Sequence, residues 1–305
     1  MRCPASTVVT NTMISSAWKI LRDAVTGFIN DGALSHGAAM AFYATTSLAP
    51  ILLIVVAIAG LAFGHDAAQL ALSAQVSGLM GSQSAELFEA TLRSAAGRSS
   101  GTVATVVGLV TLLVTASGVF GEMQLSLNKI WKVEPAPVSA SSLVRARVAS
   151  LGLVAALGFL LLVSLVASAA LAALEDLINA SIPFGAPLLS ILNAAVSFAL
   201  LSLMFAAIYK VLPDRSLEWR DVAVGAIVTA ALFTLGKSLI GWYLGTSAIA
   251  STYGAAGGLM VVLLWVFYSS EIFLFGAELT RAYSIRHGSR SDLSQLVQQG
   301  DPPSG

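Results

Sequence analysis

The chain has 305 residues, of which 56% are hydrophobic and 10% charged, whereas about a quarter of the residues in a soluble protein are charged. Sixteen basic and sixteen acidic residues give a formal net charge of zero, so the overall charge does not favour nucleic acid as a partner. The single cysteine excludes an internal disulfide, and the three histidines match no ligand spacing, so we expect no metal and no cofactor. The composition predicts an all-α, polytopic membrane protein.

Residues 1–37 are predicted to form a cytoplasmic amphipathic N-terminal helix. In the segment AWKILRDAVTGFIN, apolar side chains recur at helical spacing, at Trp18, Leu21, Val25 and Phe28. Such a helix either lies on the membrane surface with its basic residues near anionic headgroups, or caps a transmembrane bundle.

Six apolar runs are long enough to cross a hydrocarbon core of about 30 Å as helices. None alternates with a period of two, which excludes barrel strands. We therefore predict a bundle of six transmembrane helices over 38–284, with an external amphipathic segment at 66–97 and a disordered cytoplasmic tail at 285–305. The runs lie near 38–63, 102–125, 148–174, 188–211, 222–244 and 257–280.

The basic residues predict the orientation of this bundle. If the N-terminus is cytoplasmic, thirteen of the sixteen fall in inside segments, two (Arg93 and Arg98) fall outside, and Lys237 lies within a span. This excess places both the N- and C-termini in the cytoplasm. The inside set is Arg2, Lys19, Arg22, Lys129, Lys132, Arg145, Arg147, Lys210, Arg215, Arg220, Arg281, Arg286 and Arg290.

Two of the predicted spans contain a proline or a polar residue at mid-depth. In the first span, Pro50 removes the backbone hydrogen bond to the carbonyl of Thr46 and is expected to kink the helix. Kinks of this kind often form transporter sites, although proline is also ordinary in transmembrane helices. Small residues from Gly37 to Ala44 allow close helix approach there. In the fourth span, Asn193 is expected to bond a neighbouring helix.

The sixth span carries two carboxyl groups. Glu271 and Glu278 are seven residues apart and so share a helix face, which also includes Tyr268. Glu278 lies one turn from Arg281 at the cytoplasmic end, which indicates a structural role. Glu271 lies roughly 15 Å from that end, where a lone charge costs a few kcal/mol. It is either a proton or substrate site, or a protonated carboxyl group bonded to hydroxyl groups in a packed core.

Lys237, in the fifth span, is the other charge within the membrane. Its side chain can snorkel toward the outer surface along its own stem. Antiparallel helices would separate Lys237 and Glu271 by roughly 9 Å in depth, so we expect indirect coupling across one polar cavity. The candidate substrate or proton site therefore consists of Glu271, Lys237, Tyr268, Thr46 and Pro50.

Four stretches resemble the YihY/BrkB family of bacterial inner-membrane proteins, once labelled ribonuclease BN. They occur in the family's order: GAAMAFYATTSLAP at 37–50, LNKIW at 127–131, YKVLPDR at 209–215, and YGAAGGLMVVLLWVFYSSEIFLFGAEL at 253–279. The resemblance implies a six-helix bundle with cytoplasmic ends in a bacterial inner membrane. It supplies no catalytic residues.

Three classes of function follow from these observations. The first is a transporter of a lipid-like or amphipathic envelope component; no P-loop occurs, so ATP-driven transport by this chain alone is not expected. The second is a non-transporting scaffold that maintains envelope integrity with unknown partners. An enzyme, including a ribonuclease, is disfavoured, because the inside loops offer only short acidic segments such as PDRSLEWRD. Membrane lipids are the expected partners, and nucleic acid is not.

Overall fold

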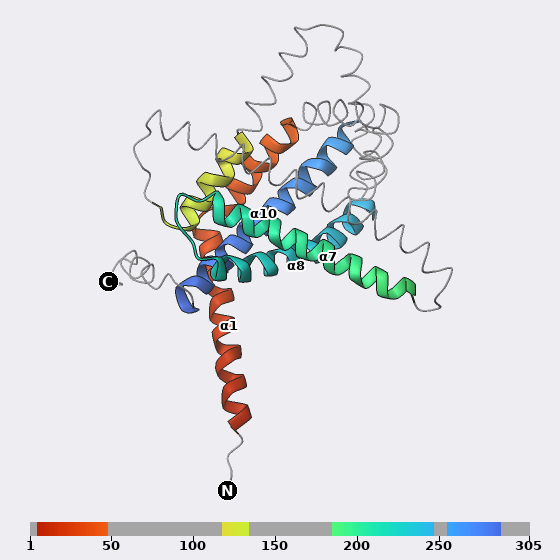
Figure 1. Cartoon of the computed structure of the whole chain (residues 1–305). Coiled ribbons are helices and arrows are strands. Elements are labelled where there is room, and N and C mark those ends of the chain that lie inside the picture. The colour runs from red at the N-terminus through yellow and green to blue at the C-terminus, as the bar shows by residue number, and fades with distance from the viewer. Residues whose placement is uncertain (1–4, 48–117, 134–184, 247–254, 288–305) are drawn as a thin grey trace. The chain divides into compact units, whose positions relative to one another are not determined.

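The structure is a computed structural model that describes residues 5–47, 118–133, 185–246 and 255–287 (Figure 1). All regular secondary structure in these ranges is helical. Pro50, the predicted segment at 66–97, the third predicted span and the tail beyond 287 lie outside the described residues. The helices are α1 (Ala5–Asn30), α7 (Gly185–Val211), α8 (Trp219–Thr246) and α10 (Ala255–His287), together with helical residues at 33–47 and 118–130.

Three of these helices are long and apolar enough to cross a membrane. The qualifying segments are Ile191–Val211 in α7, Trp219–Tyr243 in α8 and Leu259–His287 in α10. They coincide with the fourth, fifth and sixth predicted spans. The all-α class is thus confirmed for the described residues, while the count of six spans and the location of the two ends stay predictions.

Helix α1 has one covered face and one uncovered apolar face. Ala24 and Gly27 are buried, and the ring of Phe28 meets that of Phe275 edge to face at 5.9 Å. The opposite side leaves large apolar side chains exposed at helical spacing, including Trp18, which is 66% exposed, and Ile29. The sequence placed Phe28 on the apolar face with Trp18, but Phe28 contacts protein. Ile29 continues the exposed stripe instead.

The chain forms two compact units, and α8 and α10 each contribute to both. The described part of the first unit contains α1, 124–133, α7, 219–232 and 274–287. The described part of the second unit contains 33–47, 118–123, 233–246 and 255–273.

In the first unit, α8 and α10 approach through a reciprocal pair of glycines and threonines. A Cβ atom on Gly225 would lie 1.6 Å from Thr280 Oγ1, and one on Gly276 would lie 1.9 Å from Thr229 Oγ1. Each threonine hydroxyl donates to the carbonyl four residues before it, at 2.7 Å. Glycine precedes threonine by four residues in each helix, and the glycine of one helix meets the threonine of the other. The two helices therefore run antiparallel, and each has a small-xxx-small contact surface.

The second unit also relies on glycines at its helix contacts. A Cβ atom on Gly118 would meet the ring of Tyr43 at 2.6 Å, and one on Gly236 would lie 2.9 Å from the hydroxyl of Tyr268. The rings of Phe233 and Trp265 join α8 to α10 edge to face at 6.2 Å. Close approach of this kind is what stabilises helix association in lipid, where the hydrophobic effect contributes little.

Candidate functional site

Glu271 lies on α10 in the second unit, with its carboxyl group pressed against Gly37. A Cβ atom on Gly37 would lie only 2.0 Å from Glu271 Oε1 and 2.8 Å from its Cδ, so only glycine leaves room for this carboxyl group. Both carboxyl oxygens are buried and have no hydrogen-bond partner among the described residues. A buried carboxyl group without a donor is costly, and Glu271 has two such oxygens among the described residues of the second unit.

Other polar groups of the second unit occupy the same helical segment as Gly37. His36 Nδ1 lies 2.6 Å from Glu122 Oε1, which joins the 33–47 segment to the 118–130 segment. The hydroxyl of Thr45 is buried without a partner among the described residues. The 33–47 segment therefore contributes one member of a histidine–glutamate pair, and a hydroxyl group without a partner among the described residues, to the second unit.

The remaining residues of the predicted site occupy different environments. The Tyr268 ring packs on Gly236, one turn before Glu271 on α10. The hydroxyl of Thr46 donates to the carbonyls of Phe42 and Tyr43, both at 2.9 Å, so it is satisfied within its own helix. Pro50 lies outside the described residues.

Lys237 does not pair with Glu271. It lies on the exposed side of α8 within the second unit, and neither carboxyl oxygen of Glu271 has a partner among the described residues. The contact that brings Glu271 to a neighbouring helix is instead the one with Gly37. Asn193 lies on the exposed side of α7 in the first unit.

The second glutamate of α10 is in the first unit and is fully buried. Glu278 has 0% relative exposure, and its Oε2 accepts from Arg281 Nη2 at 3.1 Å and from Nε at 3.2 Å. A Cβ atom on Gly27 would lie 2.4 Å from Glu278 Oε2, so this glutamate also packs on a glycine. Asp31, at the end of α1, is bound by Lys132 Nζ at 2.5 Å.

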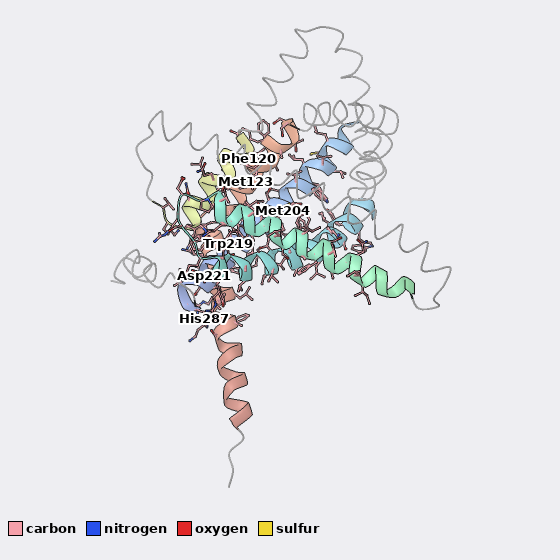
Figure 2. All side chains as sticks on the ribbon, viewed as in Figure 1. Phe120, Met123, Met204, Trp219, Asp221 and His287 are labelled. Atoms are coloured by element: carbon pink, nitrogen blue, oxygen red, sulfur yellow. The ribbon has the colours of Figure 1, made fainter. Side chains whose placement is uncertain are left out.

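Further polar contacts join α10 to α8 and α1 in the first unit. Ser284 donates to the carboxylate of Asp221 at 2.6 Å, and Arg286 binds Asp23 at 2.5 Å. Figure 2 labels Asp221 near the start of α8 and His287 at the end of α10. These bonds satisfy the polar end of α10 within protein, which explains why the helix continues seven residues past the apolar run that ends at 280.

Sequence reasoning missed most partners of the two glutamates. Gly27, Asp31 and Lys132 carry no signal in a single sequence, because Asp31 and Lys132 are 101 residues apart. Gly37 belongs to the run of small residues that predicted close approach, but nothing in that run indicates a carboxyl group as its neighbour. Among the described residues, no group of three histidine, cysteine, aspartate or glutamate side chains gathers as metal ligands.

Apolar helices long enough to span a bilayer, joined through glycines and carrying buried carboxyl groups, define this chain as a helical membrane protein. The family model described as "Virulence factor BrkB" matches residues 24–299, and the chain belongs to that family. No solved structure matches the chain.

Named relatives are likewise described as membrane proteins. The UPF0761 membrane protein of Pasteurella multocida is 35% identical over 178 residues, which cover 57% of this chain and 52% of the relative. That of Mannheimia succiniciproducens is 32% identical, with 57% and 58% covered, and that of Aggregatibacter aphrophilus is 31% identical, with 63% and 66% covered. The chain thus matches between about half and two thirds of these relatives' lengths. Their names indicate no catalytic activity.

Proposed function

We propose that this chain is a multi-pass inner-membrane transporter of a lipid-like or amphipathic envelope component, with Glu271 as its intramembrane polar site. The observation that carries this proposal is the carboxyl group of Glu271, both oxygens of which are buried on Gly37 without a partner among the described residues.

Physical cost is the reason for assigning Glu271 a function. A charged residue in the middle of a membrane helix costs about 2.5–3.5 kcal/mol on insertion scales, and such residues usually line substrate or proton pathways. A purely structural carboxyl group would have donors nearby, as Glu278 has in Arg281. Glu271 has none among the described residues, which is the state expected of a group that binds its partner only during transport.

Lys237 supports an amphipathic substrate. It is an exposed cation on α8, flanked along the helix by the exposed apolar side chains of Leu235 and Leu239. A cation surrounded by apolar side chains suits a molecule with an anionic headgroup and an apolar tail. Lys237 would then recognise the headgroup, while Glu271 acts deeper in the same unit.

The six-span topology with cytoplasmic ends is part of this proposal. It rests on the distribution of basic residues, thirteen inside against two outside, and on the three apolar helices that fall at the last three predicted spans.

The proposal is tested by lipid translocation in vesicles that contain the purified full-length protein. A fluorescent anionic lipid and a zwitterionic analogue are followed in parallel. Wild-type protein should accelerate translocation, Glu271→Gln should return the rate to that of protein-free vesicles, and Lys237→Gln should remove the preference for the anionic lipid. Glu218→Gln, which alters an exposed glutamate just before α8, is the matched control and should behave as wild type. Wild-type translocation by the Glu271→Gln protein would contradict the assigned role.

A scaffold is the second candidate, and α1 is the observation that favours it. The exposed apolar stripe through Trp18, Leu21, Val25 and Ile29 would serve a scaffold as a docking face, and transport does not require it. A scaffold predicts that polar substitutions on this stripe abolish envelope integrity in cells while Glu271→Gln leaves it intact. The opposite pattern favours the transporter.

A further inference from the structure

The ends of two helices meet α10 in the first unit. Helix α1 is followed by a turn in which Gly32 has φ of +68° and its amide donates to the carbonyl of Ile29. The 118–130 helix is followed by a turn at Lys132, in which the amides of Lys132 and Val133 donate to carbonyls three and five residues earlier. This is the Schellman pattern, which places its C′ residue in the left-handed region.

Lys132 is unusual in that position. Its φ is +51°, and it is the only non-glycine residue with positive φ among the described ranges. Glycine is preferred there because a Cβ atom is strained in the left-handed conformation. The side chain of Lys132 offsets this strain by donating to Asp31 Oδ1. A lysine thus occupies a position that favours glycine, and its ammonium group reaches Asp31 from there.

Asp31 and Glu278 each have one satisfied and one unsatisfied carboxyl oxygen. Asp31 Oδ1 accepts from Lys132, and Glu278 Oε2 accepts from Arg281. Asp31 Oδ2 and Glu278 Oε1 are buried and have no donor among the described residues. The two carboxyl groups are neighbours, because Glu278 packs on Gly27 and Asp31 follows Gly27 by one helical turn, with its amide bonded to the Gly27 carbonyl at 2.8 Å. As ionised groups neither can donate, and in a buried site their charges repel.

We propose that Asp31 and Glu278 share one proton and form a proton-binding site that joins the end of α1 to α10. A single proton gives each unsatisfied oxygen a hydrogen bond and removes the repulsion between the carboxylates. The proton comes from water and returns to water, so no other reactant is needed. This site is separate from Glu271 and does not depend on the transport proposal.

The surrounding charges favour a proton over a metal ion. The groups that act on Glu278 are Arg281 on its own helix, Asp31 from α1 and Lys132 from the end of the 118–130 helix. Lys129 lies close as well, with its Nζ 3.7 Å from where a Cβ atom on Gly32 would be. These cations oppose any further positive charge, a proton included, but only a proton can give the two unsatisfied oxygens a hydrogen bond.

The site makes the contact between α1 and α10 sensitive to pH. At low pH the shared proton is bound and the contact is intact. As pH rises the proton leaves, and two adjacent buried carboxylates then repel each other. The contact held by Asp31 and Glu278 should therefore weaken as the pH on the side of α1 rises.

The test is infrared spectroscopy of the full-length protein in lipid nanodiscs, recorded as the pH is raised. All samples carry Glu271→Gln, so that Glu271 contributes no signal. The expected result is a carbonyl band of a protonated carboxyl group that disappears at high pH. The band should be absent in both Asp31→Asn and Glu278→Gln, because the new amide donates to the remaining carboxylate. It should persist in Asp221→Asn, a buried carboxylate that already has a donor in Ser284. A band that survives Asp31→Asn or Glu278→Gln overturns the proposal.

Two further measurements begin from the protein with Asp31 and Glu278 unsubstituted. Carbon-13 labelling of aspartate and glutamate carboxyl groups should shift the band to lower frequency. If the protein with both Asp31 and Glu278 shows no such band, the proposal is overturned. The thermal unfolding midpoint should fall as pH rises. The Glu278→Gln protein, if it folds, should lose that dependence, and an unchanged pH dependence contradicts a shared proton. Stabilisation by sodium but not by choline at high pH would identify a metal cation as the ligand and likewise contradict it.

Discussion

Replacing Gly37 by alanine tests the role of Glu271 without removing the carboxyl group. The added Cβ atom would lie 2.0 Å from Glu271 Oε1, and real Cβ atoms essentially never approach another heavy atom within 3.0 Å. The carboxyl group must therefore move by about 1 Å or more, or the helices must separate, because overlap at that distance is strongly repulsive.

The predicted effect on stability is small, and the predicted effect on transport is large. Overpacking costs about 1–3 kcal/mol. Alanine in place of glycine favours the helix by about 1 kcal/mol, which leaves a net loss of about 0–2 kcal/mol. Displacement of a functional group by about 1 Å can reduce a rate by about 100-fold. A defect in transport that greatly exceeds the loss of stability is the expected result.

A second substitution should compensate for the first. Glu271→Asp shortens the side chain by one methylene and withdraws the carboxyl group by about 1.5 Å, which makes room for the Cβ atom added by Gly37→Ala. The double variant Gly37→Ala with Glu271→Asp should therefore translocate lipid faster than the product of the two single effects predicts. The coupling between contacting residues is typically about 0.5–3 kcal/mol.

Initial translocation rates and thermal unfolding midpoints are measured on the same reconstituted samples. Gly121→Ala is the matched control, because it lies in the same unit and its added Cβ atom would meet nothing within 4 Å. If Gly37→Ala transports as fast as Gly121→Ala, or if the double variant shows simple multiplicative effects, the contact between Gly37 and Glu271 has no part in transport.

Three other predictions concern stability and topology. Gly225→Ala should lower the free energy of unfolding by about 0–2 kcal/mol, the cost of the Cβ atom meeting Thr280 less the gain in helix propensity, whereas Gly241→Ala, which meets nothing within 4 Å, should be neutral or stabilising; thermal unfolding in detergent distinguishes them. Arg281→Met should cost about 3–5 kcal/mol by leaving Glu278 buried without its cation, and the double variant with Glu278→Met should recover most of that loss in the same assay. Alkaline phosphatase fused within 66–97 should be active in cells, and a fluorescent protein at the C-terminus should fluoresce; reversal of either result contradicts the proposed topology.

The length and composition of the apolar runs were sufficient to locate α7, α8 and α10, which fall at the last three predicted spans. They could not give the full extent of α10, which continues to His287. Its last turns are polar, and a hydropathy pattern ends where polar residues begin. Those turns stay helical because Asp23 and Asp221, from helices distant in sequence, bind Arg286 and Ser284.

The neighbours of the two glutamates show a second limit of the sequence. Seven-residue spacing correctly identifies Glu271 and Glu278 as residues on one helix face, because helical periodicity is a local property. What each glutamate contacts depends on tertiary structure. One packs on Gly37 without a donor among the described residues and the other on Gly27 beside Arg281, and no local pattern distinguishes the two environments.

Chemical modification of Glu271 in the unsubstituted protein tests the central claim most directly. A lipid-soluble carbodiimide is applied to vesicles that contain the protein, the modified residues are identified by mass spectrometry, and translocation is measured on the same vesicles. The account predicts that modification at Glu271 and loss of translocation rise together, and that an added amphipathic substrate slows both. Complete modification of Glu271 with translocation unchanged would contradict it.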